Sequence, residues 1–276
     1  MSTVPLLTLN NGVQIPQLGF GVWQVPNVDA VAAVKTAIEV GYRSIDTAAI
    51  YGNEEGTGQA IAECDVPRED LFVTTKLWNA EQGYDSTMVA FEESLRKLRL
   101  GYVDLYLIHW PAAGQDKYVD TWRAFAKLYA DGRIKAIGVS NFQASHLQRL
   151  FDETGTVPTV NQIELHPYLV QADMREFDAK YDIRTEAWSP LAQGGTVLAD
   201  PVITGLAERY GRTPAQVILR WHLQLGNVVI PKSVTPSRIA ENFAVFDFEL
   251  SSDDVAAITA LDRGERTGPD PDVFGA

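Results

Sequence analysis

The chain has 276 residues, of which 46% are hydrophobic, so it can bury a large core without disulfide bonds. Its 36 acidic side chains outnumber its 23 basic ones and give a net charge of −13, which argues against nucleic acid or an anionic membrane as the main partner. A single cysteine, no visible secretion signal and no membrane-length apolar run predict a cytoplasmic protein.

Short apolar runs typical of strands alternate with longer amphipathic segments along the chain. An Asn-Gly turn near the N-terminus predicts a β-hairpin ahead of them. The expected strands are Leu18–Phe20, Ser44–Asp46, Phe72–Thr75, Leu105–Ile108, Ile134–Val139, Val160–Glu164, Arg184–Ala187 and Val228–Ile230. The expected helices are Ala30–Val40, Glu54–Ala62, Ser86–Leu98, Val119–Ala130, Ser145–Phe151, Met174–Tyr181, Pro214–Gln224 and Ser237–Val245.

Eight units of a strand followed by a helix predict a single α/β domain over residues 1–276. The apolar strand cores indicate parallel strands covered on both faces. The closed form of such a sheet is a (β/α)8 TIM barrel, here with an N-terminal β-hairpin. A doubly wound open sheet is the alternative, weakened because no expected strand is followed by a G-x-G-x-x-G turn.

Ionisable and aromatic side chains gather at the C-terminal ends of the expected strands, where barrel enzymes have their active sites. Asp46 ends the second strand and Tyr51 follows it, while Lys76 and His109 end the third and fourth. Each residue alone has an ordinary structural explanation, but the four together predict a catalytic cluster. Four of the six tryptophans also fall at strand ends: Trp23, Trp78, Trp110 and Trp188.

This cluster suits protonation of an oxygen that gains negative charge, as in carbonyl reduction. A tyrosine can act as a general acid if its pKa, about 10 in water, is brought nearer to neutrality. A buried Lys76 beside the Tyr51 phenol would lower that pKa, and Asp46 would keep the lysine charged and oriented. His109 would donate to the substrate carbonyl, and a cofactor must supply the hydride.

A basic loop after the last strand predicts a phosphate site. Lys232, Ser233, Thr235 and Arg238 precede or open a helix, and helix N-termini with nearby cations bind anions. The alternative is a capped helix start with solvated charges. Trp188 can stack on a planar ring, and three further residues suit a carboxamide: Ser140, Asn141 and Gln162. Together these residues predict a nicotinamide dinucleotide lying across strands five to eight.

Three long stretches carry a family resemblance: GYRSIDTAAIYGNEEGTG (Gly41–Gly58), GRIKAIGVSNF (Gly132–Phe142) and IPKSVTPSRIAEN (Ile230–Asn242). With them the chain resembles the aldo-keto reductases over nearly its whole length, and in detail their bacterial 2,5-diketo-D-gluconate reductase-like branch. The resemblance implies an NADPH-dependent reductase in which Tyr51 donates the proton. The cofactor-binding set that it implies is Ser140, Asn141, Gln162, Trp188, Ser189, Pro190, Leu191, Gln193, Lys232, Ser233, Val234, Thr235, Arg238, Glu241 and Asn242.

The expected substrate pocket is apolar. Trp23, Trp78 and Trp110, with His109, would bind small aldehydes and ketones, among them keto-sugars or α-dicarbonyls. We expect a monomer that takes a small carbonyl substrate, NADPH or NADP as cofactor, and no metal. Two alternatives stay open: a barrel aldolase with Lys76 as a Schiff-base nucleophile, and a nucleotide-binding relative without catalysis.

Overall fold

Eight parallel strands form the centre of the computed structural model, which describes residues 4–275. They are β3 (Phe20–Gly21), β4 (Ser44–Asp46), β5 (Phe72–Leu77), β6 (Val103–Ile108), β7 (Ile134–Ser140), β8 (Val160–Glu164), β9 (Arg184–Trp188) and β10 (Val228–Val229). Neighbours in the sheet follow chain order. Every expected strand matches an observed one to within about three residues at each end.

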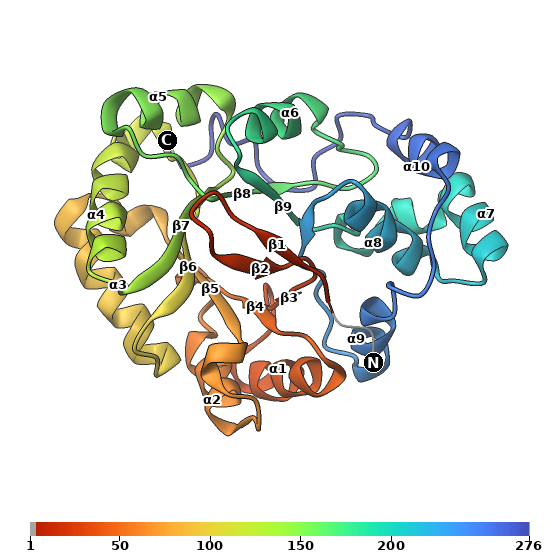
Figure 1. Cartoon of the computed structure of the whole chain (residues 1–276), viewed down its shortest axis with the longest axis horizontal. Coiled ribbons are helices and arrows are strands. Elements are labelled where there is room, and N and C mark those ends of the chain that lie inside the picture. Colours follow the sequence, from red (N-terminus) through yellow and green to blue (C-terminus); the bar gives the residue numbers. More distant parts are fainter. Residues whose placement is uncertain (1–3, 276) are drawn as a thin grey trace.

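The first and last strands meet, which closes the sheet. Leu18 pairs in parallel with Val229. The Gly19 N–H donates to the Val229 carbonyl at 2.9 Å, and the Gly21 N–H donates to the Pro231 carbonyl at 3.1 Å. The sheet is therefore the predicted (β/α)8 barrel, with helices around it (Figure 1). The doubly wound alternative is wrong, because an open sheet leaves its edge strands unpaired.

The predicted N-terminal hairpin is present and seals one end of the barrel. Its strands, β1 (Leu6–Thr8) and β2 (Gln14–Pro16), pair antiparallel and cross the centre of the view in Figure 1. Leu9 and Ile15 are buried together with apolar residues from the early parts of the barrel strands: Phe72, Leu105, Val160 and Val228. Because this end is packed with side chains, the opposite, C-terminal end is the one left for a ligand.

Ten α-helices lie among the described residues. They are α1 (Asn27–Val40), α2 (Glu54–Glu63), α3 (Tyr84–Leu98), α4 (Tyr118–Ala130), α5 (Ala144–Thr154), α6 (Ala172–Lys180), α7 (Pro201–Tyr210), α8 (Pro214–Gln224), α9 (Pro236–Phe243) and α10 (Ser252–Thr259). Helices α7 and α10 were not expected from the sequence, although Asp200 and Ser251 cap them by accepting backbone N–H bonds. No helix within residues 4–275 is long and apolar enough to cross a membrane.

Alternation along β8 and β9 separates two polar groups that adjoin in sequence. The strands pair with Asn161 opposite Thr185 and Gln162 opposite Glu186. Asn161 and Thr185 both donate to Asp178 of α6, so they face the helix layer. Gln162 and Glu186 face the barrel interior instead, because successive strand residues point to opposite sides. The C-terminal half of the barrel thereby acquires a polar interior.

Candidate active site

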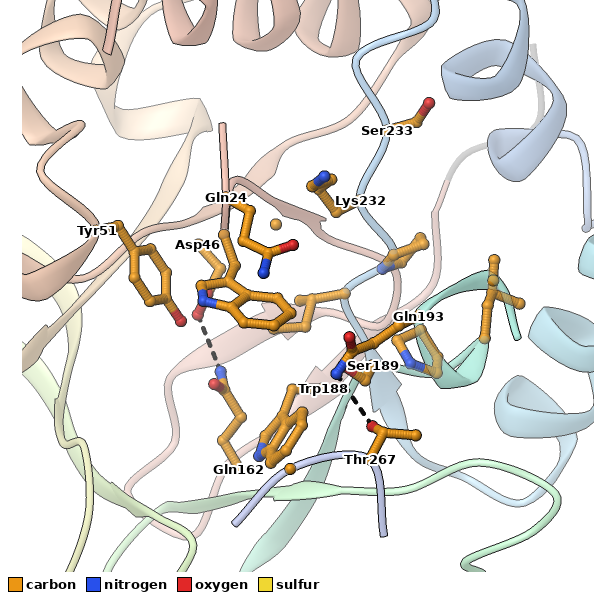
Figure 2. Close-up of a pocket in the computed structure, with 18 of the residues that line it drawn as sticks. Gln24, Asp46, Tyr51, Gln162, Trp188, Ser189, Gln193, Lys232, Ser233 and Thr267 are labelled. Atoms are coloured by element: carbon orange, nitrogen blue, oxygen red, sulfur yellow. Dashed lines mark hydrogen bonds between the residues drawn. The ribbon is translucent and has the colours of Figure 1, made fainter. Parts of the chain in front are cut away.

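A cavity of about 1120 Å³ opens at the C-terminal ends of the barrel strands. Every residue that the sequence analysis assigned to the site lines it, except Lys76, which is fully buried and bonded to Asp46. Figure 2 shows Tyr51, Trp188 and Lys232 around this space, although they come from distant parts of the chain. The fold therefore brings the whole predicted set together.

Lys76 is a buried cation at the base of the cavity. Its Nζ donates to Asp46 Oδ1 at 2.5 Å and to the Thr47 carbonyl at 2.9 Å, and it lies 5.1 Å from the centre of the Tyr51 ring. Burial opposes the charge, but Asp46 and Tyr51 outweigh it and hold the pKa of Lys76 above its usual value. A Schiff-base nucleophile must be a neutral, accessible amine. The geometry of Lys76 therefore excludes the aldolase alternative.

Tyr51 lines the cavity with its phenol protonated. Burial raises the pKa of Tyr51 above 10, Lys76 acts in the opposite direction, and Asp46 adds to the rise. Lys76 lowers the pKa of the phenol, as expected from the sequence. Burial raises this pKa by more, so the expected net fall in the pKa of Tyr51 is wrong. A phenol in this state keeps its proton at neutral pH and is available as a donor.

His109 is a neutral imidazole beside Tyr51. Burial, helped by the charge on Lys76, lowers the pKa of His109 well below 6.5. Its ring lies edge-on to two aromatic rings, with centres 5.6 Å from Tyr51 and 5.4 Å from Trp78. Its Nδ1 is buried and has no hydrogen-bond partner within residues 4–275. A neutral imidazole carries one N–H, so it can donate to a substrate oxygen next to the phenol.

Gln162 is held by two carboxylates. Its Nε2 donates to Asp46 Oδ2 at 2.9 Å, the bond drawn in Figure 2, and to Glu186 Oε2 at 2.8 Å. All three side chains are buried. A glutamine amide has two hydrogens and one oxygen. Because both hydrogens are used, the side-chain oxygen Oε1 is the group that Gln162 offers to a ligand in the cavity.

Asn141 ties the wall of the cavity together. Its Nδ2 donates to the His109 carbonyl at 3.0 Å and to Ser140 Oγ at 3.1 Å, and its Oδ1 accepts from Trp188 Nε1 at 2.8 Å. These bonds hold the Trp188 ring at the wall, where its face can stack on a planar ligand. A carboxamide contact from Ser140 or Asn141 would have to share donors and acceptors with these bonds.

Two cations without acidic partners lie where β10 leads into α9. Lys232 and Arg238 are exposed, line the cavity and form no ion pair with any residue of 4–275. The cap residue Thr235 makes no side-chain bond to the helix start, and Pro236 occupies its first turn. Thr235 therefore does not cap the helix through its side chain, and the free N–H groups and the cations suit an anion.

The C-terminal tail adds cavity residues that sequence reasoning missed. Glu164 at the end of β8 accepts from the Thr267 N–H at 2.6 Å and from the Gly268 N–H at 3.1 Å. Gly268 packs so tightly against Trp188 that a Cβ at this position would lie 2.5 Å from the ring. Phe274 packs on Trp110 with ring centres 4.5 Å apart. The aromatic Phe274 near the chain end was a sequence signal for this contact.

Strained backbone also gathers at the cavity. Four non-glycine residues that line it have positive φ angles: Gln24 (57°), Asn141 (64°), Ser189 (47°) and Gln193 (57°). Such conformations cost on the order of 1–3 kcal/mol each and are maintained where the surrounding structure requires them. They are four of the ten non-glycine residues with positive φ within residues 4–275, so backbone strain is one feature of the cavity wall.

Taken together, these observations define a (β/α)8 barrel protein whose cavity holds a phenol and an imidazole at one end and two exposed cations at the other. The sequence matches the model of the Aldo/keto reductase family over residues 17–263. It is 60% identical to an aldo-keto reductase of Mycolicibacterium smegmatis, with 98% of each chain covered. It is 55% identical to the methylglyoxal reductase DkgA of Salmonella typhimurium over 100% of both chains.

Solved structures agree with this match. The NADPH complex of a Gox0644 mutant has 51% identity and a TM-score of 0.95, with 99% of each chain covered. The Bombyx mori aldo-keto reductase in complex with NADP has 38% identity and a TM-score of 0.92, with 99% of this chain and 97% of that one covered. The chain belongs to the aldo/keto reductase family. It is an oxidoreductase that reduces carbonyl compounds with NADPH, and the resemblance seen in its motifs is confirmed.

Proposed function

We propose that Tyr51 donates the proton in this reduction and that His109 orients the carbonyl. The observation that carries the proposal is the buried Lys76–Asp46 ion pair, whose Nζ lies 5.1 Å from the Tyr51 ring centre. As the phenol gives up its proton, negative charge develops on its oxygen, and the nearby cation stabilises that charge. Asp46 keeps the cation in place. A carbonyl between phenol and imidazole would accept a hydrogen bond from each.

The chain also offers contacts for a nicotinamide cofactor. When bound, NADPH supplies the hydride that protein side chains lack. We propose that Gln162 Oε1 accepts from the carboxamide and that the Trp188 face stacks on the ring, because both groups line the cavity and are held by protein bonds. The remaining cofactor contacts are proposed for Ser140, Asn141, Ser189, Pro190, Leu191, Gln193, Lys232, Ser233, Val234, Thr235, Arg238, Glu241 and Asn242.

Arg238→Ala should weaken NADPH binding about 10- to 100-fold and leave NADH binding within about twofold. A charge-assisted hydrogen bond contributes about 1.5–3 kcal/mol, and NADH lacks the 2′-phosphate that Arg238 would contact. Fluorescence titration with both cofactors at one ionic strength measures the effect. Lys117→Ala is the matched control, because Lys117 is an exposed cation outside the cavity. Equal weakening of both cofactors would show that the phosphate assignment is wrong.

The substrate end of the cavity favours a small neutral carbonyl compound. Its wall is apolar and consists of Trp23, Ile50, Trp78, Trp110 and Phe274. The exposed cations of the cavity belong to the proposed phosphate site, and the net charge of −13 repels anions. A substrate carboxylate would lose water here without gaining a partner. Because relatives are named methylglyoxal reductases, we propose neutral α-dicarbonyls as the substrate class.

NADPH oxidation with methylglyoxal, methyl pyruvate and pyruvate tests this proposal. Methyl pyruvate and pyruvate share the reacting ketone and differ in the charge beside it. We expect kcat/KM to be at least about 30-fold higher for the two neutral compounds, which corresponds to roughly 2 kcal/mol for an unpaired charge. Pyruvate reduced as well as its ester would contradict the neutral-substrate proposal. If none of the three compounds is reduced while keto-sugars are, the α-dicarbonyl proposal is wrong.

A further inference from the structure

Glu186 is a buried carboxylate that the proposed mechanism leaves without a role. It lies on β9, is 1% exposed, and its Oε2 accepts from Gln162 Nε2 at 2.8 Å. Gln162 also donates to Asp46, which accepts from Lys76, so four buried side chains form one hydrogen-bonded chain across the barrel. Burial, with a contribution from the charge of Asp46, raises the pKa of Glu186 to about 7. Glu186 does not line the cavity itself, but it is bonded to Gln162, which does.

The geometry of the amide shows what Glu186 adds. The glutamine amide is planar, and its two N–H bonds point in different directions within that plane. One bond, to Asp46, would leave the amide free to rotate about the N–H···O direction. The second bond, to Glu186, removes that freedom and fixes the plane. Reversal of the amide would place Oε1 against the carboxylate of Asp46, which has no hydrogen to donate, so only one orientation is stable.

We propose that Glu186 is a positioning residue that, together with Asp46, fixes the Gln162 amide so that Oε1 is held as the acceptor for the carboxamide NH₂ of the cofactor. This inference depends on the proposed placement of the nicotinamide beside Gln162. The neutral form of Glu186 still accepts through its carbonyl oxygen, so the bond survives at either protonation state. Glu186 thus acts through Gln162 and need not touch the cofactor.

The same two strands provide a matched comparison on their other face. Asn161 and Thr185, the sequence neighbours of Gln162 and Glu186, donate to the buried Asp178 at 3.3 and 3.0 Å. Asp178 lies on α6, is 0% exposed and does not line the cavity. Loss of either buried carboxylate should affect stability, whereas only loss of Glu186 should affect recognition of the nicotinamide.

Binding of two oxidised cofactors without substrate tests the proposal. NADP⁺ carries the carboxamide NH₂, while its 3-acetylpyridine analogue has a methyl group there and cannot donate. The wild-type protein should prefer NADP⁺ about fivefold by titration calorimetry, which is typical of one hydrogen bond. Glu186→Met, close in volume and without a comparable acceptor, should reduce the preference below about twofold. Glu186→Gln, whose Oε1 can still accept, should restore it, and Asp178→Asn should leave it unchanged.

The possible failures are distinguishable. A full NADP⁺ preference in a folded Glu186→Met protein would overturn the role of Glu186 and leave the cofactor placement intact. No preference in the wild-type protein would overturn the Gln162 contact itself, and the role of Glu186 with it. If Glu186→Met does not fold, Glu186→Asp withdraws the acceptor by one methylene group while keeping the charge. Glu186→Asp should lose the preference for NADP⁺ to a similar extent as Glu186→Met. A Glu186→Asp protein that keeps the preference would contradict the proposal.

Discussion

Tyr51→Phe should lower the turnover of carbonyl reduction about a thousandfold and leave NADPH affinity within about twofold. A positioned general acid contributes typically 10²- to 10⁴-fold, and the phenol is the group whose proton is available beside the Lys76–Asp46 pair. The benzyl part of the side chain stays, so the shape of the cavity is preserved. Steady-state kinetics with methylglyoxal and fluorescence titration of NADPH measure the two quantities.

Tyr129→Phe is the control for this change. Tyr129 is exposed on α4 and does not line the cavity, so its hydroxyl should be dispensable. Turnover above about a tenth of the wild-type value in Tyr51→Phe would mean that another group donates the proton. A loss of NADPH binding in step with turnover would show instead that the phenol acts through cofactor binding.

Lys76→Met should lower both turnover and stability. The change removes the cation that lowers the pKa of Tyr51 and leaves Asp46 buried without its ion-pair partner. We expect turnover to fall at least about a hundredfold, within the range for a lost electrostatic contribution. The free energy of unfolding should fall by about 3–5 kcal/mol, as for other broken buried pairs. Kinetics and urea unfolding measure the two effects.

A double variant, Lys76→Met with Asp46→Asn, separates catalysis from stability. Because both charges are gone, most of the free energy of unfolding should return, while turnover should stay low. The pH profile of the reverse reaction, alcohol oxidation, gives a further check in either variant. The phenol must be ionised to accept a proton, and loss of Lys76 raises its pKa, so the rate should rise only at higher pH than in the wild type. An unchanged profile would mean that Lys76 does not tune Tyr51.

Most of the barrel could be predicted from the sequence because the alternation of strands and helices is a local property. Ser44–Asp46 and Val160–Glu164 were predicted with the bounds that the structure has. The helices α7 and α10 were missed, although their caps at Asp200 and Ser251 are local signals. In α10 only Asp254 and Ile258 are buried, so the apolar pattern that marks a helix is weak there.

The cavity wall was harder to predict where it depends on contacts across the barrel. The tail reaches the cavity because Glu164 accepts from Thr267 and Gly268, more than a hundred positions further along the chain. Nothing local to Gly268 indicates that it packs on Trp188. The roles of the four catalytic-type residues stay predictions that the proposed variants test.

The sequence by itself determined the barrel, its family and the strand-end residues that line the cavity, because motifs at strand ends are spaced by the regular βα repeat. Only the tertiary structure decided which effect dominates the pKa of Tyr51 and which groups the Gln162 amide contacts. Burial outweighs Lys76 at the Tyr51 phenol, and Gln162 donates to two carboxylates, of which Asp46 is 116 residues away. Burial and hydrogen bonding depend on distances between strands, and these distances exist only once the sheet has closed.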